Sequence, residues 1–485
     1  MKKKFISNLV LLLSLNIPIK ALWILYVDRK VYNHADVGQA VYGEYASILS
    51  FSFMFHFLLD LGVSNYNNRA IAQKPSLLNV HYPNITLIKA LLTIVYLAVV
   101  FLVADLLNFS EQSILLLKLL AVNQILNIFI YFNKTNLTGL HLFRVDSIFT
   151  VLDRVVAGTL CLLVFYDYLP VEFDIEWYII FQMIGYATSA LLSTTYIFTK
   201  IKWSAFRLDF GLVFDIIKKS IPFTLLGILM VMYSKVDIVM IKMLLSEKGN
   251  QEAGIYAGAY KLLDAGVMIC FLFASLLYPI FSKMIVDHEN VRPIITFTVK
   301  SLVVPVFIFV VIASSMNQFI MNQMYLSAEG EMYITFSILI FSFLPLASQY
   351  IFGTLLTAGN YLKVLNLTSA IGLVVNIILN YIMIPIYGAK GAAIATISTQ
   401  VLANGIQLLI AYKKFDLTLE KHYIFRAMIL VIGVIGLAYF QSSIKLNEFI
   451  KLPLLLLSGL GIAFLLKLFD LHSLLSIIEL KKSSK

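Results

Sequence analysis

The sequence predicts an all-α membrane protein with about fourteen transmembrane helices, since one crossing of a bilayer needs about 20 apolar residues. The first supporting observation is composition. Of the 485 residues, 60% are hydrophobic and only 13% are charged, and the mean hydropathy is +0.88. A soluble domain carries about 25% charged residues. So few charges cannot cover a surface that faces water, so most of the surface must face lipid.

The second observation is that the apolar residues gather into runs separated by short gaps. The runs cover residues 5–27, 41–63, 85–107, 113–133, 146–166, 178–198, 220–244, 254–281, 294–321, 333–356, 362–385, 388–412, 423–440 and 450–469. The first run follows three lysines, as in a secretion signal, but it continues past Pro18 without a small-residue cleavage site. We therefore expect it to be retained as the first helix. The gaps leave no room for a soluble domain.

The third observation is the distribution of basic residues among the gaps. With the N-terminus inside, the inner gaps hold 21 Lys and Arg residues, and the outer gaps hold six. Cytoplasmic loops of membrane proteins are rich in these residues. The pattern predicts an even number of helices and both termini in the cytoplasm. It also explains the net charge of +10 without a nucleic-acid partner.

Two short matches indicate an internal duplication. Gly43-Glu44-Tyr45-Ala46 opens the second run, and Gly254-Ile255-Tyr256-Ala257 opens the eighth. A looser match relates the segments before the fifth and eleventh runs, again six runs apart. Repeats of six helices are a known transporter plan, with the substrate site between the halves. We predict two pseudo-symmetric six-helix lobes, at 1–200 and 201–412, followed by two C-terminal helices and a cytoplasmic tail at 413–485.

Four cations lie deep within the apolar runs: Lys20, Arg154, Lys235 and Lys261. Charges at this depth are costly and are expected to face a bundle interior or a wet cavity. We predict that these four bind an anionic substrate, such as a phosphate or an acidic sugar. The alternative is that they form buried ion pairs that only fix helix packing. Other lysines lie near run ends, where their stems reach the interface as anchors: Lys89, Lys118 and Lys242.

Signals for catalysis or cofactor binding are absent from the sequence. The two cysteines, Cys161 and Cys270, lie inside apolar runs and indicate neither a disulfide framework nor a metal site. The sequence contains no Walker A loop, zincin motif or nucleophile elbow. We therefore predict a transporter rather than an enzyme, with no cofactor and no metal.

Three stretches of the chain resemble the O-antigen and polysaccharide flippases (Wzx-type) of the multidrug/oligosaccharidyl-lipid/polysaccharide exporter superfamily. The first runs from Gly43 to Ala72, and the second from Lys235 to Pro279. The third and most specific includes Thr357-Ala358-Gly359-Asn360 and the segment from Ile384-Pro385 to Ala393. Together they extend over nearly the whole chain.

The resemblance implies alternating access that moves an undecaprenyl-pyrophosphate-linked oligosaccharide, an O-antigen or capsule repeat unit, from the cytoplasmic to the periplasmic leaflet. The deep cations would hold the pyrophosphate or acidic sugars while the lipid tail stays in the bilayer. An H⁺ or Na⁺ gradient could drive the cycle through Asp60, Asp237 or Asp264, and polysaccharide polymerase machinery is a candidate partner.

Three other functions remain open. A drug/cation antiporter of the same superfamily would need an anionic cavity, and the deep cations argue against one. A membrane-embedded glycan polymerase would need a large periplasmic loop, whereas the outer gaps are short. A structural scaffold would not need deep charges.

Overall fold

The computed structural model describes residues 14–201, 208–417, 421–444 and 446–468. Within these ranges the chain folds into helices and the turns between them, with no strand. Its contacts divide it into two compact units, Met1–Gly254 (unit 1) and Ile255–Lys485 (unit 2). The predicted all-α class is confirmed for this part of the chain. The N-terminal lysines, the first part of the first predicted run and the predicted C-terminal tail lie outside it.

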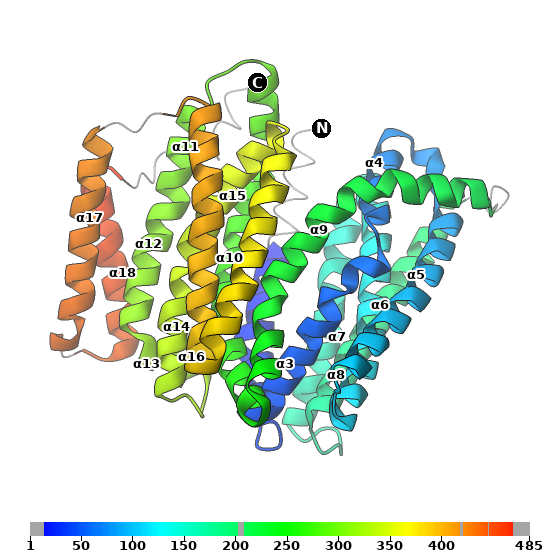
Figure 1. Ribbon diagram of the computed structural model, residues 1–485, viewed down its shortest axis with the longest axis horizontal. Coiled ribbons are helices and arrows are strands. Elements are labelled where there is room, and N and C mark those ends of the chain that lie inside the picture. The colour runs from blue at the N-terminus through cyan, green and yellow to red at the C-terminus, as the bar shows by residue number, and fades with distance from the viewer. Residues whose placement is uncertain (1–13, 202–207, 418–420, 445, 469–485) are drawn as a thin grey trace. The chain divides into compact units, whose positions relative to one another are not determined.

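Unit 1 begins with a helix over residues 14–32 that contains a π-helical stretch, Trp23–Asp28, and ends in α2, Arg29–Tyr32. Seven helices follow. The last of them, α9, packs against α3, α4 and α5 (Figure 1). They are α3 (Gly38–Met54), α4 (Val63–Gln73), α5 (Leu78–Leu106), α6 (Glu111–Gly139), α7 (Phe143–Phe165), α8 (Ile175–Phe198) and α9 (Phe210–Leu244). Polar residues begin several of them: the Asp174 carboxylate caps α8 and the Asp209 carboxylate caps α9.

Unit 2 contains most of α10, Gly249–Val286, and the helices after it. These are α11 (Arg292–Thr298), a π-helix (Val299–Val303), α12 (Val304–Ser315), α13 (Asn317–Met324), α14 (Gly330–Phe341), α15 (Phe343–Ala358), α16 (Leu362–Lys414), α17 (Lys421–Phe440) and α18 (Glu448–Leu465). Helices α17 and α18, the predicted C-terminal pair, pack against each other and against α12. A core that includes Ile308, Val434 and Leu455 holds them there.

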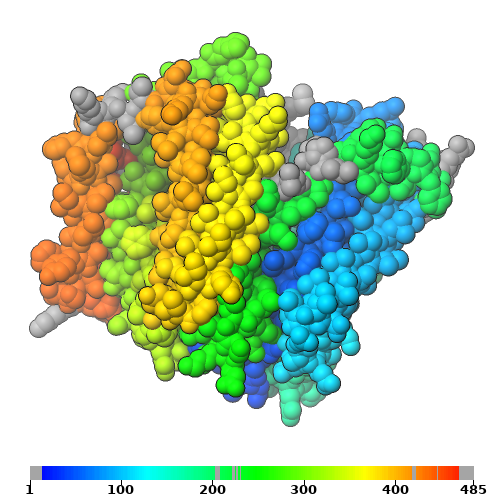
Figure 2. Space-filling model, in the orientation of Figure 1, coloured from blue at the N-terminus to red at the C-terminus, as the bar shows by residue number. Residues whose placement is uncertain are grey.

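Helix α16 contains a chain reversal at Gly388, whose φ of 58° and ψ of −136° are not helical. A Cβ added at Gly391 would lie 2.3 Å from the Met383 carbonyl oxygen, so the two halves of α16 meet there with backbone in close contact. Glycine is required at both positions because a side chain would be strained at the first and would clash at the second. Figures 1 and 2 show the halves, yellow and orange, side by side. This break coincides with the predicted gap between the eleventh and twelfth runs.

Nine segments of the described chain are long and apolar enough to cross a membrane, and α16, which holds two predicted runs, counts as one of them. The remaining predicted runs fall on four helical segments: residues 14–32, α3, α8 and α9. Many large apolar side chains on these helices are exposed, as expected of a surface that faces lipid. The chain is therefore a multi-pass membrane protein. The count of fourteen crossings and the lobe boundaries at 200 and 412 stay predictions.

The second run is not one continuous helix, which corrects the prediction of a span over 41–63. Helix α3 ends at Met54, a 3₁₀ turn follows at His56–Leu59, and α4 begins at Val63. Leu61 and Gly62 both have positive φ, 44° and 72°. This left-handed turn redirects the chain, and the backbone N–H and hydroxyl of Ser64, at the start of α4, donate to the Asp60 carboxylate.

Candidate functional site

Three cations lie close together inside unit 1. Lys20 is within electrostatic range of Arg154, Lys134 and Asp153, and Lys134 is within range of both Asp146 and Asp153. We call these five residues the cationic cluster. The side chains of the three cations are only partly exposed. Because three cations face two carboxylates, the cluster carries an excess of positive charge among apolar helices.

Small residues lie where the first helix and α8 pack against α7 beside the cluster. Gly158 on α7 faces Trp23 of the first helix, and the Arg154 guanidinium lies 6.0 Å from that indole ring. A Cβ added at Gly185 on α8 would lie 2.3 Å from the Asp153 carbonyl oxygen, so α8 touches the α7 backbone there. Arg154 is near the middle of the 23-residue helix α7. It is therefore about 16 Å from either end of that helix, at 1.5 Å per residue.

The structure thus brings together two of the four predicted substrate-binding cations, Lys20 and Arg154, and adds Lys134. The end of the fourth run at residue 133 predicts a loop position for Lys134, but α6 continues to Gly139. Lys235 is half-buried on α9, with its Nζ 5.8 Å from the centre of the Phe53 ring. Lys261 is half-buried on α10 in unit 2. The substrate-binding role of all four stays a prediction.

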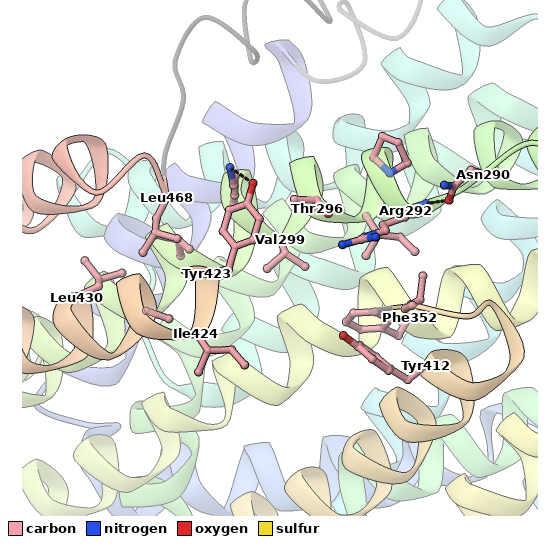
Figure 3. A pocket seen from close by; sticks show the side chains of 16 residues that line it. Asn290, Arg292, Thr296, Val299, Phe352, Tyr412, Tyr423, Ile424, Leu430 and Leu468 are labelled. Carbon is pink, nitrogen blue, oxygen red and sulfur yellow. Dashed lines mark hydrogen bonds between the residues drawn. The ribbon is translucent and has the colours of Figure 1, made fainter. Parts of the chain in front are cut away.

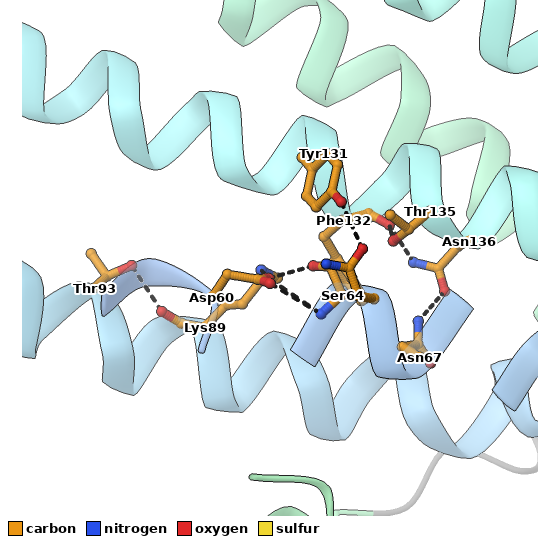
Figure 4. Close-up of polar contacts among 10 residues, drawn as sticks. Asp60, Ser64, Asn67, Lys89, Thr93, Tyr131, Phe132, Thr135 and Asn136 are labelled. Atoms are coloured by element: carbon orange, nitrogen blue, oxygen red, sulfur yellow. Dashed lines mark hydrogen bonds and ion pairs between the residues drawn. The ribbon is translucent and has the colours of Figure 1, made fainter. Parts of the chain in front are cut away.

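The three acids predicted for ion coupling have different surroundings. Asp237 on α9 is buried, with 3% of its surface exposed, whereas Asp264 on α10 is exposed. Asp60 is buried and forms an ion pair with Lys89, with 2.6 Å between Oδ1 and Nζ. The pair is part of a network of polar contacts among α4, α5 and α6 (Figure 4). The coupling role of these acids stays a prediction.

The position of Lys89 corrects its prediction as an interfacial anchor. Its side chain is only 4% exposed, and its Nζ also lies 5.4 Å from the centre of the Phe132 ring. Lys242 also has polar partners. Its Nζ donates to Glu44 Oε1 at 2.9 Å and to Ser113 Oγ at 2.8 Å. Lys118, by contrast, is exposed, as an anchor should be.

Glu44 is the centre of a second network in unit 1. Besides Lys242, it accepts hydrogen bonds from the Ser113 hydroxyl and, at 3.2 Å, from Asn250 Nδ2. Glu44 is buried, and its partners come from α6, α9 and the start of α10. The network therefore ties α3 to three other helices at the end that the loop charges predict to be periplasmic.

The two segments that suggested a duplication contact each other directly. A Cβ added at Gly43 would lie 1.9 Å from the Asn250 carbonyl oxygen and 2.4 Å from the Gly254 backbone nitrogen. Tyr32 Oη donates to the Gly254 carbonyl oxygen at 3.3 Å. Sequence comparison could detect the match but not the contact.

Asp28 is a buried carboxylate that the sequence analysis does not single out. Asp28 follows the end of the first apolar run and is 3% exposed. Its Oδ1 accepts hydrogen bonds from Tyr42 Oη and Tyr178 Oη, both at 2.9 Å. The nearby Tyr45 Oη accepts from Gln182 Nε2 at 3.2 Å. The signal that could have found it is the cluster of tyrosines at the ends of runs. Among the described residues, no group of three or more His, Cys, Asp or Glu could hold a metal ion.

A family model described as "Polysaccharide biosynthesis protein" matches residues 8–285, more than half of the chain. The chain belongs to this family. No curated protein matches the chain. The resemblance to polysaccharide flippases that the sequence motifs indicate is thereby supported by a match that includes the helices of the cationic cluster.

The fold is similar to that of solved transporters. A multidrug resistance MATE family transporter of the MOP superfamily, in an inward-facing conformation, has a TM-score of 0.65 at 14% identity, with 84% of this chain and 98% of that chain covered. The lipid II flippase MurJ, in an inward closed conformation, has a TM-score of 0.65 at 15% identity, with 96% and 97% covered. A MOP superfamily transporter from Pyrococcus furiosus has a TM-score of 0.56 at 11% identity, with 84% and 94% covered. The chain therefore has a MOP-type transporter fold.

Proposed function

We propose that this chain is a flippase that moves an undecaprenyl-pyrophosphate-linked oligosaccharide, an O-antigen or capsule repeat unit, across the bacterial inner membrane by alternating access. The observation that carries the proposal is the cationic cluster. An arginine grips phosphate oxygens with two parallel hydrogen bonds, and a lysine adds a point charge. Arg154 would hold the pyrophosphate, with Lys20 and Lys134 beside it.

The proposal includes the fourteen-helix topology, with two six-helix lobes and both termini in the cytoplasm. Lys235 and Lys261 would meet the substrate at other stages of its path. Coupling to H⁺ or Na⁺ would use a buried acid. Asp60 and Asp237 are the buried candidates for this role, whereas Asp264 is exposed. Association with a polysaccharide polymerase would place the product where it is consumed.

The family match and the solved neighbours support transport but do not choose the substrate, because the fold serves both drug export and lipid II flipping in the similar structures. The sign of the charge in the site supports an anionic substrate. In the transporter from Pyrococcus furiosus, a reverse polarity of the binding pocket suggests a different function. A drug/cation antiporter would need excess negative charge in its site, and the cationic cluster has the opposite sign.

The test is transport by the purified protein in vesicles loaded with lipid-linked oligosaccharide, with an impermeant lectin reporting each sugar that reaches the far leaflet. We expect Lys20→Gln combined with Arg154→Gln to slow transport by at least about tenfold, because charge-assisted hydrogen bonds are lost. The matched control removes two exposed cations, Lys118→Gln with Lys363→Gln, and should stay within about twofold of the parent.

Two results would count against the proposal. Unchanged transport in a folded Lys20→Gln, Arg154→Gln protein would exclude the cationic cluster as the substrate site. No transport by the parent protein, together with export of a cationic dye from the same vesicles, would favour the antiporter. Folding of each variant is checked by its thermal unfolding midpoint in detergent.

A further inference from the structure

A pocket of about 680 Å³ lies within unit 2. Its walls come from α11 and the π-helix after it, from α15, from the C-terminal end of α16 and from α17 (Figure 3). The volume is in the range of about 300–1,000 Å³ that small-molecule sites occupy. Much of the lining is apolar, including Phe352, Ile424, Leu430 and Leu468.

Two cations line this apolar pocket, and none of the sixteen described residues that line it carries a carboxylate. Lys300 lies on the π-helix, and its Nζ donates to Tyr423 Oη at 3.2 Å and lies 4.6 Å from the centre of that ring. Arg292 begins α11. Figure 3 shows Arg292 and Tyr412 at one end of the pocket and Tyr423 at the other. The pocket is therefore positive and complementary to an anion.

A third polar group in the pocket is the buried hydroxyl of Tyr412. It has no hydrogen-bond partner within the described part of the chain. A buried hydroxyl without a partner has lost its hydrogen bonds to water without replacing them, which is unfavourable. Tyr412 is also within electrostatic range of Arg292. A ligand oxygen at this end of the pocket would accept from both the hydroxyl and the guanidinium, and would remove that cost.

The pocket lies at the helix ends that are predicted to face the cytoplasmic leaflet, which contains anionic lipids. It is built from the start of α11, the end of α16 and the start of α17. The loop charges predict these ends to be cytoplasmic, and Lys283, Lys413 and Lys414 nearby in sequence are exposed. Basic pockets between helices on the cytoplasmic side bind anionic lipid headgroups, and the cytoplasmic leaflet carries negative lipids.

We propose that this pocket binds one anionic diacyl phospholipid of the cytoplasmic leaflet. Arg292 and the Tyr412 hydroxyl hold the phosphate at their end of the pocket. Lys300, at the Tyr423 end, adds positive charge, and the acyl chains lie along the apolar wall that α17 provides. Because α17 forms one wall and α11, α15 and α16 form the others, the bound lipid links the C-terminal helix pair to the rest of unit 2. This lipid is a resident ligand, distinct from the transported substrate.

The test uses the purified full-length protein in detergent and native mass spectrometry. The protein is titrated with palmitoyl-oleoyl phosphatidylglycerol, and separately with the phosphatidylcholine that has the same acyl chains. We expect one phosphatidylglycerol to bind at least about tenfold more tightly than the phosphatidylcholine, since only the former leaves net negative charge to meet the two cations. Arg292→Gln with Lys300→Gln should remove this preference, and Tyr412→Phe should weaken binding by a few-fold.

The matched control removes two exposed cations at the same predicted membrane face, Lys283→Gln with Lys363→Gln. It should leave phosphatidylglycerol binding unchanged. Equal binding of the two lipids, or an equal loss in the control and the pocket variant, would overturn the proposal. So would displacement of the bound phosphatidylglycerol by farnesyl phosphate at the same concentration, which would assign the pocket to the isoprenoid-linked substrate. Lipid binding is measured without transport, so a failure here leaves the flippase proposal standing.

Discussion

Two buried charge clusters of unit 1 use the same kinds of residue in opposite proportions. The Asp60–Lys89 pair matches one acid with one cation at 2.6 Å, and the Ser64 backbone N–H also donates to the carboxylate. The cationic cluster sets Lys20, Lys134 and Arg154 against only two acids. An ion pair whose charges cancel has no net charge with which to attract a charged ligand. An excess of cations, by contrast, can be neutralised by an anionic substrate.

The largest expected effect is on the balanced pair. Asp60→Asn keeps the size of the side chain and one acceptor for Ser64 but leaves Lys89 as an uncompensated buried cation. Breaking a buried ion pair in this way costs about 3–5 kcal/mol of unfolding free energy. Asp60→Asn with Lys89→Met removes both charges and should recover most of that loss. Denaturant unfolding of the purified proteins in detergent measures both.

The comparison would break if Asp60→Asn unfolded like the parent protein but no longer transported substrate. Asp60 would then act in ion coupling, as the sequence allowed, and the pair would be part of the transport cycle. A loss of stability shared by the single and double variants would instead mean that the carboxylate matters for its bonds to Ser64, not for Lys89.

A smaller effect is expected in the cationic cluster, and it concerns transport instead of stability. Arg154→Lys keeps the charge but removes the planar fork that binds two phosphate oxygens at once. We expect transport to fall about tenfold, which is about 1.4 kcal/mol, with the unfolding midpoint unchanged. The control is Arg144→Lys, the same exchange at an exposed position of α7. Equal rates for Arg154→Lys and the parent would show that only the charge is needed.

The two clusters also differ in how far the sequence could reveal them. Depth within apolar runs was enough to select Lys20 and Arg154. It could not select Lys134, because the run ends in a polar stretch in which the Asn133 and Asn136 side chains form hydrogen bonds with other helices inside the bundle. Nor could spacing pair Asp60 with Lys89, which are 29 residues apart on different elements. Pairing across helices depends on packing, and packing is not periodic in the sequence.

The fold likewise has features that a local sequence pattern predicts and features that it does not. The apolar runs predict most of the helices and the break at Gly388, because a run of apolar residues is visible in consecutive positions of the sequence. The break after Met54 was missed, since the residues around it stay apolar while Leu61 and Gly62 turn the backbone. The contact between Gly43 and Gly254 joins segments more than 200 residues apart, and only the folded chain shows it.

The smallest expected effect comes from another ion pair of unit 1, which is less buried than the Asp60–Lys89 pair. Lys242 and Glu44 are paired at 2.9 Å, but their side chains are 17% and 9% exposed. Glu44 also keeps Ser113 and Asn250 as donors if the lysine is lost. Lys242→Met should therefore cost only about 1 kcal/mol of unfolding free energy, and Glu44→Gln a similar amount. Lys242→Met could instead prove as costly as Asp60→Asn in the same unfolding experiment. The donors that remain at Glu44 would then not compensate for the lost lysine, and the cost would depend on burial of the charge alone.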